Sequence, residues 1–461
     1  MENQPLNLFE RFNQWITESI MVKLFSIGFL TLILLIPASW IEELIQERQS
    51  RANEAILEVS DKWSGQQTIT GPVLMIPFTK IEKSRRWSDG KQLEELIESV
   101  HQAYFLPEGY QVKCTVSPEV LHRGIFDVAV YKSEISMQAT FALPDFSTWS
   151  IPDSQVHWKE AVLINGITDL RGISENPVIK IGEKQLYSNA TSDIGLILIP
   201  EEETNPRLVQ SGVVTTLGWS TRMDAVSDFS IQLSLKGSER LYFLPTGQST
   251  VIQTEGQWPS PSFEGKFLPE SRTIHESGFT ATWKVLSFNR PFAPQWIDKE
   301  QSLAGSEFGV RLLIPADQYQ KSTRTAKYGQ LIILLAFTVL FLLEVTTKIK
   351  IHPFQYILIG AALIIYYTLL LSISEQVGYN TAYMIASIAT TVLVTLYASS
   401  FLKRKSIMAL FSGLMVCFYI FIFIIIQAED FSLLIGSIGL FMIIGLLMYF
   451  SRNINWYGTK N

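Results

Sequence analysis

Cysteine and charge are both scarce in this sequence. Its 461 residues include two cysteines, which excludes a disulfide-dense secreted scaffold and a zinc site with four cysteine ligands. Charged residues make up 17% of the chain, whereas a typical soluble protein has roughly 25%. The net charge of −6 gives no support for nucleic acid as a partner. Because 47% of the residues are hydrophobic, the chain has ample apolar surface to bury and is not disordered.

Catalytic signatures are also missing. The sequence has no G-x-S-x-G elbow, no glycine-rich phosphate loop and no H-E-x-x-H motif. Its five histidines show no metal-ligand spacing. His275, Glu276 and Ser277 are consecutive, so in a strand they point to alternate faces and do not form a triad. We therefore expect a protein that is not an enzyme and that has no cofactor and no metal.

Six long apolar runs predict a membrane protein. A helix needs about 20 apolar residues to cross a bilayer core about 30 Å thick. The runs are Val22–Ile41, Tyr328–Val345, Tyr356–Ile373, Tyr379–Leu402, Ile407–Ile426 and Phe431–Phe450. The alternative, buried core helices, does not suit five such runs separated by short loops. We interpret the first run as an uncleaved anchor, because Pro37-Ala38-Ser39-Trp40 is a poor cleavage site for a signal peptide.

The loops between these runs alternate in charge, and this pattern predicts their orientation. Basic residues occupy the loops after the second and fourth runs and the C-terminal tail: Lys348, Lys350, Lys403, Arg404, Lys405, Arg452 and Lys460. The charged residues of the other two loops are all acidic: Glu375, Glu429 and Asp430. Because basic loops face the cytoplasm, we expect both termini inside the cell and residues 42–327 outside.

The external segment is expected to be mostly β structure. It holds 36 acidic and 28 basic residues, as a soluble domain would. Apolar residues recur at helical spacing up to Trp63, and after Gly65 the period changes to two, which favours antiparallel sheets packed as one or two sandwiches. The predicted parts are a cytoplasmic tail and anchor helix (1–41), a helical stalk (42–65), a mainly β domain (66–327) and a five-helix transmembrane bundle (328–461).

Ionisable residues are rare inside the predicted spans. Glu344 is the main candidate for a role in transport, but it lies one residue from the end of its span. We therefore interpret it as an interfacial carboxylate that reaches the headgroups. The small residues Ala382, Ala386 and Thr390 are spaced four apart, which predicts tight helix packing and no aqueous pore.

Several short motifs resemble those of the CreD family of bacterial inner-membrane proteins. The family's order of one span, a large external β domain and five further spans is the order predicted above. The motifs are Gly71–Pro77, Thr168–Ile173, Trp258–Gly265, Glu276–Phe279 with Trp283, Asp317–Gln320 with Arg324, Lys327 and Tyr328, His352–Tyr356, Ser374–Glu375, and Arg452–Tyr457. One departure is Asn455, where the family pattern leads us to expect Asp.

The resemblance implies an inner-membrane protein with a role in cell-envelope integrity. Family members are linked to a carbon-source-responsive two-component system and to colicin tolerance. The resemblance brings no enzymatic activity and no ligand, so the motif residues are site candidates of unknown role. They are Asp169, Arg171, Trp258, Glu276, Trp283, Asp317, Arg324, Lys327, Glu344, His352, Glu375, Arg452 and Trp456.

Simple physical roles suit some of these candidates. Asp169 and Arg171 are expected to pair across a turn that ends in Gly172. His352-Pro353 is expected to open the third transmembrane helix, because proline is tolerated in a first turn. Arg324 and Lys327 have two possible partners. One is the acidic stalk, at Glu42, Glu43 and Glu47, and the other is lipid phosphate.

Three functions stay open from the sequence. The first is a non-catalytic envelope protein, whose external domain binds an envelope protein or lipid while the bundle anchors it in the bilayer. The second is a transporter or flippase for a lipid-like molecule, which needs a continuous cavity through the C-terminal spans. The third is a membrane sensor, which needs a cytoplasmic partner because the cytoplasmic loops are short.

Overall fold

The computed structural model describes residues 20–88, 91–196, 211–225, 228–298, 301–314, 317–347, 349–428 and 431–452. The chain divides into two compact units. One contains residues 1–52 and 315–461, and the other contains residues 53–314. We describe each unit by itself. Helix α2 (Ile20–Trp63) supplies residues to both units and is continuous across their boundary.

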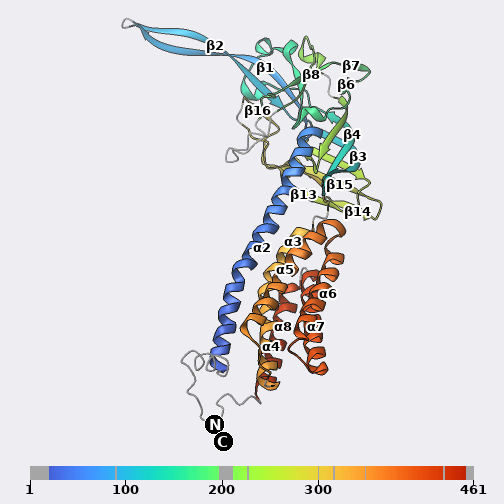
Figure 1. Ribbon diagram of the computed structural model, residues 1–461. Helices are drawn as coiled ribbons and strands as arrows, with labels where there is room; N and C mark the ends of the chain where they lie inside the picture. Colours follow the sequence, from blue (N-terminus) through green and yellow to red (C-terminus); the bar gives the residue numbers. More distant parts are fainter. Residues whose placement is uncertain are drawn as a thin grey trace, which may run out of the picture. The chain divides into compact units, whose positions relative to one another are not determined.

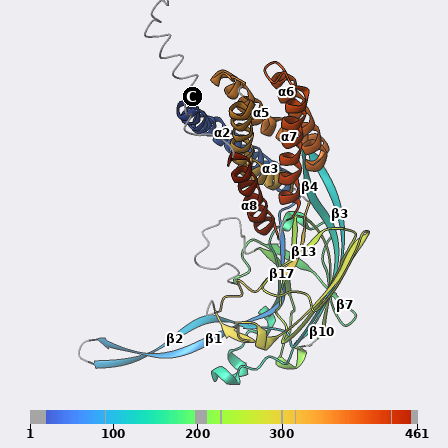
Figure 2. The ribbon, with the colours of Figure 1, turned by 90° about the horizontal axis from the view of Figure 1, so that it is seen from below.

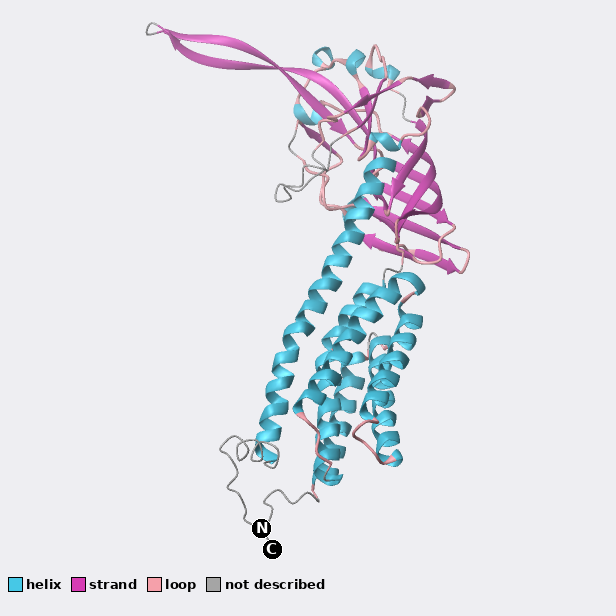
Figure 3. Cartoon of the chain, in the orientation of Figure 1, coloured by secondary structure: helices cyan, strands magenta, loops and turns pink. Residues whose placement is uncertain are grey.

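The first unit is helical and includes the predicted spans. Besides α2 it contains α3 (Asp317–Lys327), α4 (Gly329–Thr347), α5 (Pro353–Val377), α6 (Tyr379–Ala398), α7 (Lys405–Gln427) and α8 (Ser432–Ser451). Helices α4 to α8 run side by side (Figure 3). Among the described residues, six helices are long and apolar enough to cross a membrane, as predicted. Residues 317–327, which we had grouped with the β domain, form helix α3 and belong to this unit.

Close packing in the helical unit follows from small residues and from one face of α2. Ala382 and Ala386 are fully buried and Thr390 nearly so, which confirms the predicted packing face of α6. On α2, Leu34 is buried and contacts the place where a side chain at Gly360 of α5 would lie. A side chain at position 360 would collide with the end of the Leu34 side chain, which would have to move aside.

The second unit is a mainly β domain built from two sheets, as predicted. The larger sheet contains β1 (Gln67–Ser88), β2 (Lys91–Phe105), β5 (Val162–Ile167), β8 (Ser188–Thr191), β9 (Gly212–Thr216), β11 (Arg240–Leu244), β13 (Pro261–Gly265), β16 (Gln295–Ile297) and β17 (Phe308–Leu312). The smaller contains β3 (Gly109–Arg123), β4 (Phe126–Thr140), β6 (Val178–Ile181), β7 (Lys184–Leu186), β10 (Asp228–Ser238), β12 (Ser249–Gly256), β14 (Ser271–His275) and β15 (Gly278–Leu286).

The two sheets share one hydrophobic core. Buried side chains of the larger sheet, such as Ile76 and Phe243, belong to the same cluster as Val112 and Trp283 of the smaller sheet. Along much of β3 and β4 alternate residues are buried, which is the period of two expected for strands with one face in a core. The sheets are not wholly antiparallel, however: β1 pairs with β11, and β12 with β3, in parallel. The prediction of antiparallel sheets was therefore wrong for these two pairs. In each pair the two strands are far apart in the sequence, so no tight turn connects them.

Strands β1 and β2 continue past the sheet as a two-stranded ribbon. Their register is unbroken from Leu74, opposite Phe105, to Ser88, opposite Lys91. Figures 1 and 2 show the ribbon extending well beyond the other strands of the β domain in two perpendicular views.

Candidate functional site

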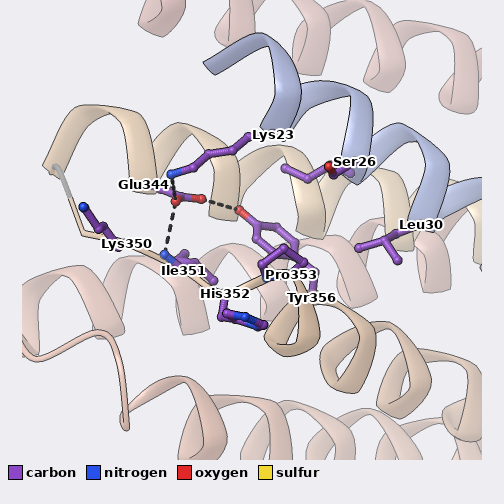
Figure 4. Close-up of a pocket in the computed structure, with 10 residues that line it drawn as sticks. Lys23, Ser26, Leu30, Glu344, Lys350, Ile351, His352, Pro353 and Tyr356 are labelled. Carbon is purple, nitrogen blue, oxygen red and sulfur yellow. Dashed lines mark hydrogen bonds and ion pairs between the residues drawn. The ribbon is translucent and has the colours of Figure 1, made fainter. Parts of the chain in front are cut away.

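Glu344, in the last turn of α4, is the centre of a buried polar cluster. Its Oε1 accepts hydrogen bonds from Lys23 Nζ at 2.6 Å and from the Ile351 backbone N–H at 3.1 Å. Its Oε2 accepts one from the Tyr356 hydroxyl at 3.1 Å. Figure 4 shows these groups converging on the carboxylate from three segments, namely α2, the α4–α5 loop and α5. Only 4% of the Glu344 side chain is exposed, so its interpretation as a headgroup-facing carboxylate was wrong.

The start of α5 is fixed by its own sequence. His352 is the N-cap: its Nδ1 accepts a hydrogen bond from the Phe354 N–H at 3.2 Å, and the Gln355 side chain accepts one from the His352 N–H at 2.9 Å. Pro353 occupies the first turn, as predicted. This capping box holds the short loop and places Tyr356 within reach of Glu344.

A cavity of about 260 Å³ lies beside the Glu344 cluster. Its lining residues combine apolar and charged side chains. They are Lys23, Ser26, Ile27, Leu30, Glu344, Lys350, Ile351, His352, Pro353 and Tyr356. Among the residues that the structure describes, Lys350 makes no ion pair. With Lys23 offset by Glu344, the cavity therefore carries a formal charge of about +1 from Lys350.

A second ion pair joins α2 to the last turn of α5. Arg48 donates from Nε to Glu375 Oε1 and from Nη2 to Glu375 Oε2, each at 2.7 Å, and Tyr319 of α3 donates to Oε1 at 3.0 Å. Glu375 is 9% exposed. A bidentate pair of this kind fixes geometry as well as charge. The bundle therefore has one buried and one mostly buried carboxylate near its span ends.

Ion pairs other than those predicted for Arg324 and Lys327 link α2 to the C-terminal helices. Within the described ranges, no ion pair connects Arg324 or Lys327 to Glu42 or Glu43. Glu47 pairs instead with Arg51 on its own helix. The helical period explains the difference: Arg48 follows buried Ile45 by three residues and shares its face, whereas Glu43 and Glu47 are exposed.

Asp169 and Arg171 form the predicted pair in the β domain and also hold the end of α2. Arg171 donates to Asp169 Oδ2 at 2.8 Å, and its Nη1 donates to the backbone oxygen of Asp61 at 2.6 Å. Asp169 Oδ2 accepts from the Gly65 N–H at 2.9 Å. A Cβ at Gly172 would collide with the Lys236 carbonyl oxygen, so this turn requires glycine for space.

These contacts set the charge state of the pair. Burial by itself would raise the pKa of Asp169. The hydrogen bonds from the Arg171 side chain and from the Gly65 and Arg171 backbone N–H groups outweigh it, and the net pKa lies below its ordinary value. The pKa of Arg171 is raised, mainly by its hydrogen bond to Asp169.

The remaining candidates are scattered. Trp258 and Trp283 are buried in the β-domain core, where their indole N–H groups donate to the carbonyls of Leu313 and Phe267. Glu276 lies exposed in the turn between β14 and β15. Asp317 begins α3, and Arg452 stacks on Tyr449 at 4.4 Å. Trp456 lies outside the described residues.

Sequence reasoning missed three residues of the polar clusters: Lys23, Arg48 and Tyr319. For Lys23 the available signal was a lone cation at the start of an apolar run, and for Arg48 it was helical spacing from the apolar residue Ile45. Tyr319 lies in the family motif Asp317–Gln320, which was the available signal for it.

The comparisons with known proteins agree with the architecture. The model of the family "Inner membrane protein CreD" matches residues 19–457. The chain belongs to the CreD family. It is also similar to the inner membrane protein CreD of Escherichia coli (strain K12), with 29% identity over 439 residues that cover 94% of this chain and 93% of the relative. The family and the six apolar helices together make the chain a multi-pass inner-membrane protein.

Proposed function

We propose that this CreD-family protein maintains cell-envelope integrity without catalysing a reaction, and that its β domain binds another envelope component. The observation that carries the proposal is the β1–β2 ribbon. The charge pattern of the loops supports a periplasmic β domain, with both termini in the cytoplasm.

One face of the ribbon carries three exposed apolar side chains, grouped around Glu98 and beside Lys83. Residues directly opposite share a face, so Ile81, Leu96 and Val100 lie together, because Ile81 pairs with Glu98 between the other two. They are 43%, 63% and 69% exposed. A two-stranded ribbon is marginally stable alone in water, and neighbouring exposed apolar side chains mark interaction surfaces. A partner bound to this face of the ribbon would cover these exposed apolar side chains.

The ion pairs give the helical unit its part in this function. Lys23–Glu344 and Arg48–Glu375 bind two sites of α2, 25 residues apart in sequence, to the bundle. Helix α2 then continues without a break to the end that Arg171 and Asp169 hold. Helix α2 is therefore a helix that both units share. We infer that the bundle anchors and orients the β domain.

In-cell crosslinking of the full-length protein tests the proposal. A photoreactive residue in place of Leu96 should give a discrete adduct with one envelope component, identified by mass spectrometry. The same residue in place of Met223, which is 89% exposed in the same domain, is the control. Val100→Glu should abolish the adduct and increase the permeability of the envelope to detergent. Equal crosslinking at both positions, or an intact envelope after Val100→Glu, would count against the proposal.

A groove between α6 and α7 favours a second candidate, a transporter or flippase for a lipid-like molecule. Its volume is about 420 Å³ and its lining is almost wholly apolar, with Ile388, Val416 and Phe423 among its residues. Tyr419 also lines it. Lipid scrambling by the purified protein in vesicles would support this candidate, and its absence would leave the envelope-binding role.

A further inference from the structure

The cavity beside Glu344 has the chemistry of a lipid headgroup site. We propose that it binds the phosphodiester group of an anionic phospholipid, with one acyl chain lying along α2. The proposal is independent of what the β domain binds. It rests on the donors, the net charge and the apolar wall of this cavity.

Three groups can donate hydrogen bonds to phosphate oxygens. Lys23 has three N–H donors, of which Glu344 Oε1 accepts one. Lys350 lines the cavity and makes no ion pair among the residues described. The third donor is His352: its Nδ1 accepts from the Phe354 N–H and carries no proton, so the proton of the neutral ring is on Nε2.

The charge of the cavity matches one phosphodiester. Lys23 and Glu344 cancel, which leaves the single positive charge of Lys350 to balance one negative phosphate. The cavity also lies at the N-terminus of α5, a helix of 25 residues whose dipole favours an anion there.

The apolar wall and the position of the cavity favour a lipid over a free anion. Ser26, Ile27 and Leu30 follow Lys23 by one and two turns of α2 and line the same cavity. The other wall includes residues 350–352 of the connection between two spanning helices, so the cavity opens at the depth where phospholipid headgroups lie. Inorganic phosphate would use the polar donors and leave Ile27 and Leu30 uncovered.

Lipid binding to the purified full-length protein in detergent tests the proposal by native mass spectrometry. Phosphatidylglycerol should bind at least tenfold more tightly than phosphatidylcholine. The variant Lys350→Gln/His352→Asn should lose about tenfold in affinity, because asparagine retains an N-cap acceptor while the distal ring donor is removed. Lys403→Gln removes the same charge from an exposed loop residue and should change the affinity less than twofold.

The outcomes separate the alternatives. Equal losses in the double variant and in Lys403→Gln would indicate nonspecific charge attraction and overturn the proposal. Equal retention of both lipids by the unaltered protein would also overturn it. Displacement of phosphatidylglycerol by millimolar inorganic phosphate would assign the site to a free anion. Unchanged thermal unfolding of the double variant, measured in parallel, shows that the loss of lipid is not a loss of fold.

Discussion

Replacing Glu344 by Gln should destabilise the helical unit because it leaves Lys23 without a counter-ion. Gln is close in size to Glu and keeps an oxygen that can accept from the Ile351 N–H. The only large change is therefore the loss of the negative charge that Lys23 contacts at 2.6 Å. Glu344→Gln is for this reason a cleaner perturbation than Glu344→Ala, which would also open a cavity.

The structure sets the expected size of this effect. Removing one partner of a buried ion pair costs about 3–5 kcal/mol. Lys23 is 20% exposed, so its ammonium can recover some hydration, and we expect the lower end of that range, about 3 kcal/mol. The double variant Lys23→Met/Glu344→Gln removes both charges, and its stability should lie within about 1 kcal/mol of the unaltered protein, because no unpaired charge remains.

Unfolding of the full-length protein in mixed micelles by increasing sodium dodecyl sulfate measures these free energies. The coupling energy between the two positions, taken from the double-mutant cycle, should be at least about 2 kcal/mol. Lys405→Met, at an exposed lysine of α7, controls for the loss of a lysine charge and should change stability by less than about 0.5 kcal/mol. Additive effects of Lys23→Met and Glu344→Gln would refute the reasoning.

Three further predictions concern the other clusters and the orientation. Arg48→Met should cost about 3 kcal/mol in the same micelle assay because Glu375 loses its bidentate partner, and adding Glu375→Gln should recover most of this loss; a further loss would contradict the pairing. The folded-state pKa of Asp169 is lowered, so its stabilisation is present above about pH 3.9 and is lost as the pH falls through the folded pKa. Asp169→Asn should therefore flatten the acid dependence of hydrogen exchange in the β domain, and an unchanged dependence would assign it to other groups. A reporter that is active only outside the cytoplasm should work when fused after Ala428 and fail after Arg404, and the reverse result would overturn the proposed topology.

Local patterns predicted most of the elements. The apolar runs gave the six spanning helices because a bilayer crossing has a fixed minimum length. The period of two after Gly65 gave the mainly β character of the second unit. Strand β4 runs without a break from Phe126 to Thr140. The polar residue Ser133 does not interrupt it, because its hydroxyl donates to the Leu235 carbonyl of the adjacent strand β10.

The sequence by itself determined where apolar and polar segments lie, how the β residues alternate, and the local Asp169–Arg171 turn and His352 cap. Each of these depends on residues within about one turn or strand of one another. Only the tertiary structure decided which strands are neighbours and which charges meet. Lys23 and Glu344 are 321 positions apart, and Arg48 and Glu375 are 327 apart. Because Glu344 lies near the end of its span, the sequence predicted a solvated carboxylate. The packing of α2 and α5 instead buries it, and α2 supplies its counter-ion Lys23.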